Sequence, residues 1–194
     1  MADTETEAGT DPGAATTRDR VLNAAVKRFM REPYDKATLR SIAGEAGVDV
    51  AYVHRLFGSK QLLFREVLSV IQARVLEQWF EEGDFLEVLT AASRRHGGLL
   101  TVEGGNPIDL FIHSIGSPEA TAEIGEFIRT HTLKRFEEGL GGPDAARKAE
   151  KLFAFLIGSR IARRYIGLNS LEGRAPEEAG EWLSEAIVAL CRDD

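Results

Sequence analysis

The sequence has one cysteine, no long apolar run and no overall excess of basic residues. A single cysteine, Cys191, excludes a disulfide framework and any metal site built from several cysteines. No apolar stretch approaches the roughly 20 residues that span a membrane, and the first residues lack the basic and then apolar pattern of a secretory signal. With 31 acidic and 24 basic residues, the 194-residue chain has a net charge of −7, which argues against binding a polyanion. These absences predict an acidic, globular protein of the reducing cytoplasm, with no membrane partner.

The motifs of common enzymes are also absent. The sequence contains no HExxH, no G-x-S-x-G, no phosphate-binding loop and no dinucleotide fingerprint. Cys191 lies near the end of the chain without a basic partner pattern, which favours an inert thiol over a nucleophile. We therefore expect neither catalysis nor a cofactor or metal site.

The charge is distributed unevenly along the chain. Residues 1–16 contain four acidic residues and no Lys or Arg, and we expect this tail to be disordered because it has too little apolar surface to fold. Residues 17–65 carry ten basic and five acidic residues, a net charge of +5, whereas residues 66–194 have a net charge of −8. A basic segment in front of an acidic body indicates a surface for a polyanion within residues 17–65.

Helical periodicity dominates the sequence, and strand signals are scarce. Thr16 and Asp19 form a possible capping pair for the first helix, which Pro33 ends. The pattern predicts an all-α protein of about nine helices. The other expected helices cover residues 39–46, 50–57, 60–80, 85–96, 108–115, 118–140, 144–166 and 176–191.

The two short helices at 39–46 and 50–57 have complementary apolar faces. Ile42 and Ala46 form a stripe on the first, and Val53 and Phe57 form one on the second. Gly47 can adopt the left-handed conformation that reverses the chain after so few residues. This is the helix-turn-helix pattern, whose second helix enters the major groove of DNA.

The residues around this pattern resemble the TetR-type transcriptional regulators. The resemblance covers about residues 17–68, including 38–60 and the following sequence SKQLLF. Residues 158–165 and 171–173, with the final helix, are similar to C-terminal domains of actinobacterial members. The resemblance implies a DNA-binding domain at 17–62 and a helical ligand-binding and dimerisation domain at 63–194. It also implies a regulator, typically a repressor, that a small molecule releases from a palindromic operator.

The resemblance further implies which residues contact double-stranded operator DNA. Thr38 would bind a phosphate through its hydroxyl and backbone N–H, Arg40 would read a guanine, and Lys60 would offer its ammonium to a phosphate. The positions expected to face the groove are Asp49, Val50, Ala51, Tyr52, His54 and Arg55. Asp49 replaces the usual Ser and His54 the usual Tyr, so these departures affect the choice of operator.

The acidic body carries the implied homodimer interface and effector pocket. The dimer candidates are Leu156, Ile161, Trp182 and Ile187, and the ligand-binding candidates are Trp79, Phe85, Phe111, His113, Phe127 and Phe155. Packing inside one chain is the alternative for every apolar residue in both sets. Two functional alternatives also stay open: a regulator of the same fold without a small-molecule response, and a helical enzyme or carrier with a vestigial head.

Overall fold

The computed structural model describes residues 16–79, 84–96, 106–168 and 176–192. Within these ranges every regular element is a helix, as the sequence predicts, and the helices form nine continuous segments. The expected disordered tail, 1–16, lies outside the described residues except for Thr16. The elements are α1 (Thr17–Arg31), α2 (Leu39–Ala46), α3 (Val50–Phe57), α4 (Lys60–Trp79), α5 (Phe85–His96), α6 (Pro107–Ser114), α7 (Pro118–Phe127), η1 (Ile128–Leu133), α8 (Lys134–Leu140), α9 (Ala145–Arg164) and α10 (Pro176–Cys191). No helix among the described residues is long and apolar enough to cross a membrane.

The first three helices begin and end at the caps that the sequence predicts. Thr16 starts α1 with a reciprocal capping box, in which its hydroxyl accepts from the Asp19 backbone N–H and the Asp19 carboxylate accepts from the Thr16 N–H. Gly47, at φ +68°, ends α2 in the left-handed conformation, where a side chain would be strained. Asp49 then caps α3 after a two-residue turn. These caps fix the angle between α2 and α3.

Helices α1 to α4 enclose one apolar core, which we call the head. Its centre is an aromatic group in which the Phe64 ring lies 4.9 Å from both Phe29 and Tyr34, edge to face. All three side chains are almost fully buried. The same core continues into the body through Leu110 of α6 and Ile124 of α7, so the head packs directly against the body.

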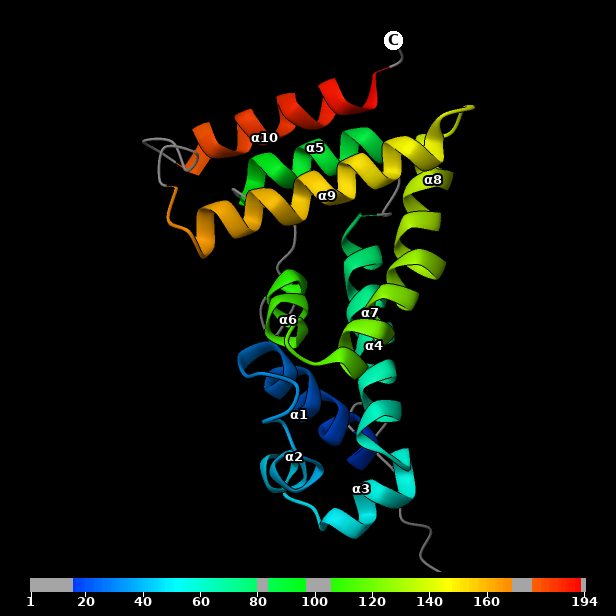
Figure 1. Cartoon of the computed structure of the whole chain (residues 1–194), viewed down its shortest axis with the longest axis vertical. Coiled ribbons are helices and arrows are strands. Elements are labelled where there is room, and N and C mark those ends of the chain that lie inside the picture. Colours follow the sequence, from blue (N-terminus) through cyan, green and yellow to red (C-terminus); the bar gives the residue numbers. More distant parts are fainter. Residues whose placement is uncertain (1–15, 80–83, 97–105, 169–175, 193–194) are drawn as a thin grey trace, which may run out of the picture.

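The body lies at the other end of the long axis (Figure 1). Helices α5, α9 and α10 form a layer there, while α4 and the α7–η1–α8 rod run between this layer and the head. α5 and α10 pack closely because Gly180 has no side chain: a Cβ at this position would lie 2.6 Å from the Arg94 Cα. Phe85, Leu152 and Ile187 belong to the second apolar core, beneath this layer.

The rod made of α7, η1 and α8 is the expected helix 118–140. Its limits are confirmed, but its middle six residues are π-helical instead of α-helical. In a π-helix each N–H bonds five residues back, which widens the turn and shifts the side chains relative to a regular helix. The rod is therefore continuous but irregular beside the centre of the body.

Polar contacts hold the head and the middle helices together. Glu123 of α7 accepts hydrogen bonds from Arg65 and Gln61 of α4. Asp109 of α6 accepts from Arg160 of α9 at 3.1 Å and from the Tyr165 hydroxyl at 3.2 Å. α6 is thus joined to the body by these contacts and to the head by its apolar side.

Candidate nucleic-acid interface and internal cavity

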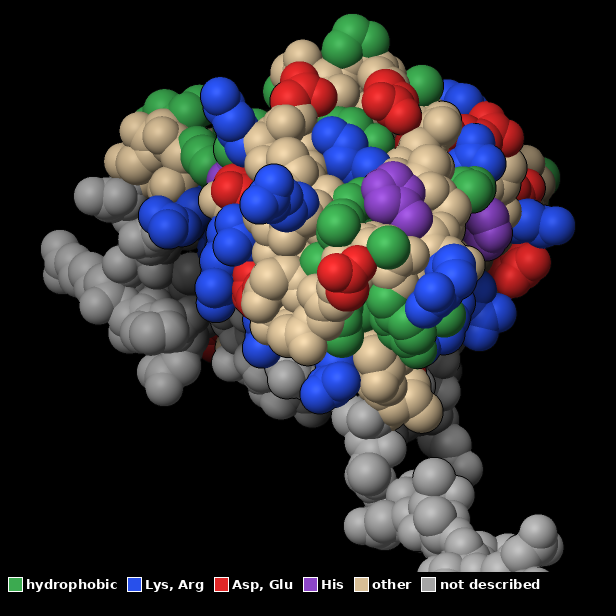
Figure 2. Space-filling model, turned by 90° about the horizontal axis from the view of Figure 1, so that it is seen from below, with side chains coloured by type: hydrophobic (Ala, Val, Ile, Leu, Met, Phe, Trp, Pro, Cys, Tyr) green, Lys and Arg blue, Asp and Glu red, His purple; other side chains and the backbone are tan. Residues whose placement is uncertain are grey.

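One face of α3 is free of protein contacts and carries most of the predicted groove-facing residues. Val53 and Phe57 point into the head core, which leaves Ala51, His54 and Arg55 exposed on the opposite side, with Tyr52 half-buried. The Arg55 guanidinium lies 5.4 Å from the centre of the Tyr52 ring, a favourable cation–π arrangement. Figure 2 shows this end from below, with Lys and Arg side chains spread over its surface.

Two of the predicted DNA contacts in α3 also serve the helix itself. The Asp49 carboxylate accepts from the Ala51 backbone N–H at 2.7 Å, so one of its oxygens is used in capping. The His54 Nδ1 lies 3.1 Å from the Gly58 carbonyl. Because a carbonyl only accepts, Nδ1 carries the proton and Nε2 is left toward solvent. The His54 ring is therefore oriented by its own helix end.

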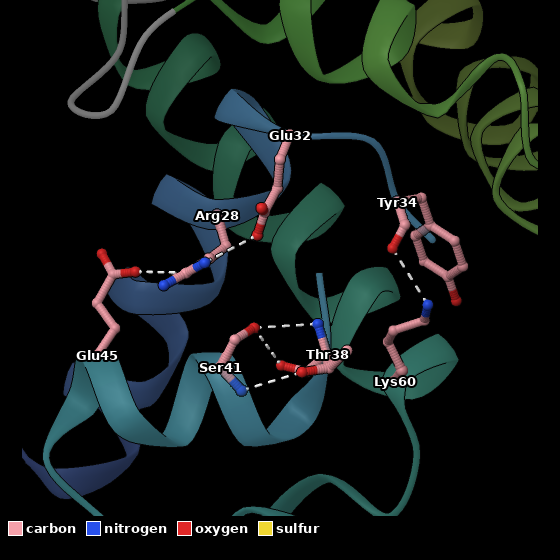
Figure 3. A network of polar contacts seen from close by, with 7 residues as sticks. All are labelled: Arg28, Glu32, Tyr34, Thr38, Ser41, Glu45 and Lys60. Atoms are coloured by element: carbon pink, nitrogen blue, oxygen red, sulfur yellow. Dashed lines mark hydrogen bonds and ion pairs between the residues drawn. The ribbon is translucent and has the colours of Figure 1, made fainter. Parts of the chain in front are cut away.

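The N-terminus of α2 presents one free cation. Arg40 is exposed, and no hydrogen bond or ion pair joins it to any described residue. Thr38 is exposed as well, but its backbone N–H donates to the Ser41 hydroxyl at 3.1 Å, and its own hydroxyl accepts from the Ser41 N–H (Figure 3). The expected phosphate contact through the Thr38 N–H is thus corrected: the capping box uses this group, and the hydroxyl proton remains as the donor.

The Lys60 ammonium, which the resemblance assigns to a phosphate, makes contacts within the head. Its ammonium donates to the Tyr34 carbonyl at 3.1 Å and lies 3.9 Å from the centre of the Tyr34 ring (Figure 3). These contacts hold the cation against Tyr34, and its contact with a phosphate stays a prediction. The chain offers no sequence signal for this, because Tyr34 lies 26 positions earlier.

Ion pairs account for part of the basic surplus of the head. Arg28 donates to Glu45 at 2.8 Å and to Glu32 at 3.1 Å, joining α1 to α2 (Figure 3). Arg18 pairs with Glu66, and Arg65 pairs with Glu123. Arg40 and Arg55, within α2 and α3 themselves, have no carboxylate partner among the described residues.

The body contains an apolar cavity of about 130 Å³ between α4, α6, the rod and α9. Two predicted ligand-binding residues, Phe111 and Phe127, line it. Three lining residues are polar: Gln72, Thr132 and Arg135. The remaining lining residues are Leu68, Ile71, Val75, Pro107, Ile108, Leu110, Ile124, Ile128, Phe136, Phe153, Leu156 and Ile157.

Gln72 is one of the polar lining residues that the sequence prediction missed. Its Oε1 is buried and has no hydrogen-bond partner. A signal was present in the sequence: Leu68, Ile71 and Val75 form an apolar stripe of α4, and Gln72 occupies the i+4 position of that stripe. A polar residue on an apolar stripe points to a buried polar site.

The other ligand-binding candidates lie outside the cavity lining. Phe85 packs on Phe136 at 5.3 Å between ring centres, and Phe155 packs on Trp182 at 5.8 Å. His113 is half-buried with its Nδ1 unpartnered, but it does not line the cavity. The Trp79 side chain lies outside the described residues.

The dimer candidates divide into two kinds. Leu156 and Ile187 are 4% and 0% exposed within a single chain. They are therefore buried inside one chain, as the alternative interpretation of these apolar residues expects. Ile161 and Trp182 remain half-exposed. Among the described residues no group of acidic, His and Cys side chains could hold a metal ion, and burial raises the pKa of the Cys191 thiol above its usual value.

Two family models match the chain. The model of bacterial regulatory proteins of the tetR family matches residues 21–67, which contain α2 and α3. The model of the tetracyclin repressor-like C-terminal domain matches residues 94–190, half of the chain. No curated protein sequence gives a significant match.

Solved structures show the same fold. A TetR-family regulator from Streptomyces coelicolor is 23% identical, with 95% of this chain and 99% of that chain covered and a TM-score of 0.56. NalD, the secondary repressor of the MexAB-OprM multidrug efflux pump in Pseudomonas aeruginosa, is 20% identical, with 89% and 95% covered and a TM-score of 0.58. A regulator from Saccharomonospora viridis in complex with choline is 17% identical, with 88% and 95% covered and a TM-score of 0.61.

Proposed function

Because the chain belongs to the TetR family of bacterial transcriptional regulators, we propose that it is a dimeric repressor released from a palindromic operator by a small molecule. Residues 17–62 bind the DNA in the cytoplasm, and residues 63–194 bind the effector and form the dimer. The DNA-binding role follows from membership of the family. The effector-binding role rests on the cavity in the body.

The observation that carries the proposal is the course of α4. Its first turn lies next to α3 in the head, and its fourth and fifth turns, with Ile71, Gln72 and Val75, form one wall of the cavity. A ligand that moves this wall also moves the end of the same helix that supports α3. One rigid element therefore joins the effector site to the DNA-reading surface.

The proposed dimer uses the exposed sides of α9 and α10. Ile161 and Trp182 are half-exposed there, and Gly158 of α9 has open space around it, since a Cβ would meet nothing within 4 Å. A two-fold dimer through this face would place two copies of α3 on successive half-sites of a palindrome.

Fluorescence anisotropy with the DNA upstream of the protein's own gene tests the proposal. We expect sequence-selective binding that weakens steeply with salt, and release of the DNA by at least one compound that raises the melting temperature of the free protein. Binding without sequence selectivity would overturn the proposal that the protein is a transcriptional regulator. Selective binding that no stabilising compound affects would instead favour the regulator without a small-molecule response.

A further inference from the structure

The exposed imidazole ring of His54 has one nitrogen occupied and one free. Its Nδ1 lies 3.1 Å from the Gly58 carbonyl oxygen, and no other hydrogen bond or ion pair joins the ring to any described residue. Because a carbonyl oxygen only accepts, Nδ1 donates this bond and carries the proton. In the neutral ring, Nε2 therefore has a lone pair and no hydrogen.

The place of His54 on α3 makes a DNA phosphate its partner. A recognition helix reads base edges with its N-terminal residues, and His54 is the fifth of the eight residues of α3. Its side chain is exposed next to Arg55, on the side opposite the head core. A phosphate oxygen accepts hydrogen bonds and does not donate them, so the lone pair of a neutral Nε2 would face another acceptor.

The ring has two ways to gain a hydrogen on Nε2. The proton can move from Nδ1 to Nε2, which breaks the bond to Gly58 and costs about fivefold in the equilibrium constant. Alternatively the ring takes up a second proton. For an ordinary histidine at pH 7 this costs only about threefold, and the imidazolium then gains a charge-assisted hydrogen bond to the phosphate. Proton uptake is therefore the favoured route.

The surroundings of His54 supply no counter-charge before DNA arrives. Among the acidic residues, Glu45 pairs with Arg28, and Glu66 pairs with Arg18. The carboxylates of Asp19 and Asp49 accept from backbone N–H groups at the starts of α1 and α3. The charged and titratable side chains of α3, of α2, and of the nearest turns of α1 and α4 are Asp49, Tyr52, Arg55, Arg40, Glu45, Arg18, Asp19, Arg20, Lys60, Arg65 and Glu66. The first negative group that can meet Nε2 is thus a phosphate.

From this geometry we propose that His54 takes up a proton when the head binds DNA. Nε2–H then donates to a phosphate oxygen while Nδ1–H stays on the Gly58 carbonyl. One proton per protomer passes from water to the ring, and no covalent bond of the DNA changes. The protein therefore binds its operator more tightly as the pH falls through the neutral range. The inference rests on the proposed function and makes its DNA-binding surface sensitive to pH.

Fluorescence anisotropy of the full chain on its upstream DNA, between pH 8 and pH 6, tests this inference. The ionic strength is held constant, because salt alone changes the affinity. We expect the affinity to rise about fivefold per protomer. Calorimetry in two buffers of different ionisation enthalpy counts the protons, and we expect the uptake of about 0.5 to 1 per protomer near pH 7.

The opposite dependence on pH has its own physical meaning. A neutral Nε2 accepts a hydrogen bond from the amino group of adenine or cytosine in the major groove, and protonation would abolish that contact. An affinity that falls with falling pH would therefore assign His54 to a base and overturn the inference. An affinity independent of pH, without proton uptake, would overturn it as well.

Three variants assign the effect to one ring. His54→Gln is neutral at every pH, so it should lose the dependence and bind more weakly than the unmodified protein at pH 6. His54→Arg is charged at every pH, so it should also lose the dependence but keep high affinity at pH 8. His131→Gln is the control, because His131 is exposed on the rod in the body, and it should keep the full dependence. A His54→Gln protein that keeps the dependence contradicts the inference.

The outcome is separable from the proposed function. Selective operator binding that does not change with pH leaves the regulator standing and makes the protonation of His54 wrong. Proton uptake with every duplex, without sequence selectivity, supports the contact of His54 with phosphate and overturns the regulator. A protein that binds no duplex at any pH contradicts both.

Discussion

Two basic side chains of the head, Arg40 and Lys60, have opposite surroundings. Arg40 extends from α2 without a partner among the described residues, whereas the Lys60 ammonium is held by the carbonyl and the ring of Tyr34. The resemblance implies that both contact DNA, Arg40 at a guanine and Lys60 at a phosphate. Their difference depends on where Tyr34 packs in three dimensions, which local spacing does not encode.

Arg40→Ala and Lys60→Met should therefore have different effects. We expect Arg40→Ala to weaken operator binding about tenfold, with a shallower salt dependence or reduced selectivity, and to leave the melting temperature unchanged. Lys60→Met removes a cation–π contact and a hydrogen bond and should cost about 1–2 kcal/mol of stability, a fall of several degrees. Thermal melts and anisotropy titrations at several salt concentrations measure both. A stable Lys60→Met protein with the larger loss of DNA affinity would contradict this assignment.

At the scale of elements, helix limits could be predicted and helix contacts could not. Thr16, Thr38, Asp49 and Gly47 mark the ends of helices through local hydrogen bonds and backbone conformation, so they can be read directly from the sequence. The π-helical turn at 128–133 contacts α9, and its residues carry no distinct local pattern. The contacts of Asp109 with α9 likewise depend on tertiary packing.

The crossing of α5 and α10 depends on Gly180. A Cβ there would lie 2.6 Å from the Arg94 Cα and 2.8 Å from two carbonyl oxygens, and backbone atoms cannot move aside as a side-chain end can. We expect Gly180→Ala to destabilise the protein by about 1–3 kcal/mol, measured by denaturant unfolding.

Gly125→Ala in α7 is the matched control. A Cβ at this position would meet only the flexible end of Arg129, at 3.4 Å. Because alanine favours the helix over glycine, this variant should be stabilised by up to about 1 kcal/mol. Equal effects of the two substitutions would show that the α5–α10 crossing is looser than described.

The ion pair between Arg65 of α4 and Glu123 of α7 makes the stability of the protein depend on pH. The guanidinium of Arg65 lowers the pKa of the Glu123 carboxyl below its ordinary value, against the opposing effect of burial. A pKa lowered by folding stabilises the protein above the ordinary pKa near 4.5, and this contribution disappears as the pH falls through the folded value.

Glu123→Gln should therefore melt about 2 °C lower than the unmodified protein at pH 7, with the difference vanishing in acid. Thermal melts between pH 3 and pH 7 measure this. Glu126→Gln is the control, because Glu126 and its partner Arg129 are 64% and 65% exposed and such a pair contributes little. A difference for Glu123→Gln that persists at pH 3 would show that packing, and not charge, is responsible.

At the scale of the whole molecule, the proposed dimer predicts that one surface residue controls DNA affinity from a distance. Ile161→Glu places a charge on the exposed side of α9, far from α3. We expect it to shift the protein to monomers and to weaken operator binding about a hundredfold or more, because a monomer contacts one half-site. Sedimentation velocity and anisotropy measure the two effects.

The control for this surface is Ile166→Glu. Ile166 is 66% exposed just beyond α9, so a charge there should change neither assembly nor DNA binding. Monomers in the unmodified protein at micromolar concentration would contradict the proposed interface directly.

The packing of α10 on α5 also determines the order in which the protein is completed during synthesis. The residues of the head core between Val21 and Ile71 leave the ribosome early, and their contacts are local in sequence. α5 leaves soon afterwards, but its partner surface around Gly180 is synthesised only after α6 to α9. The side of α5 that packs on α10 therefore has no partner until the helices between them have been synthesised.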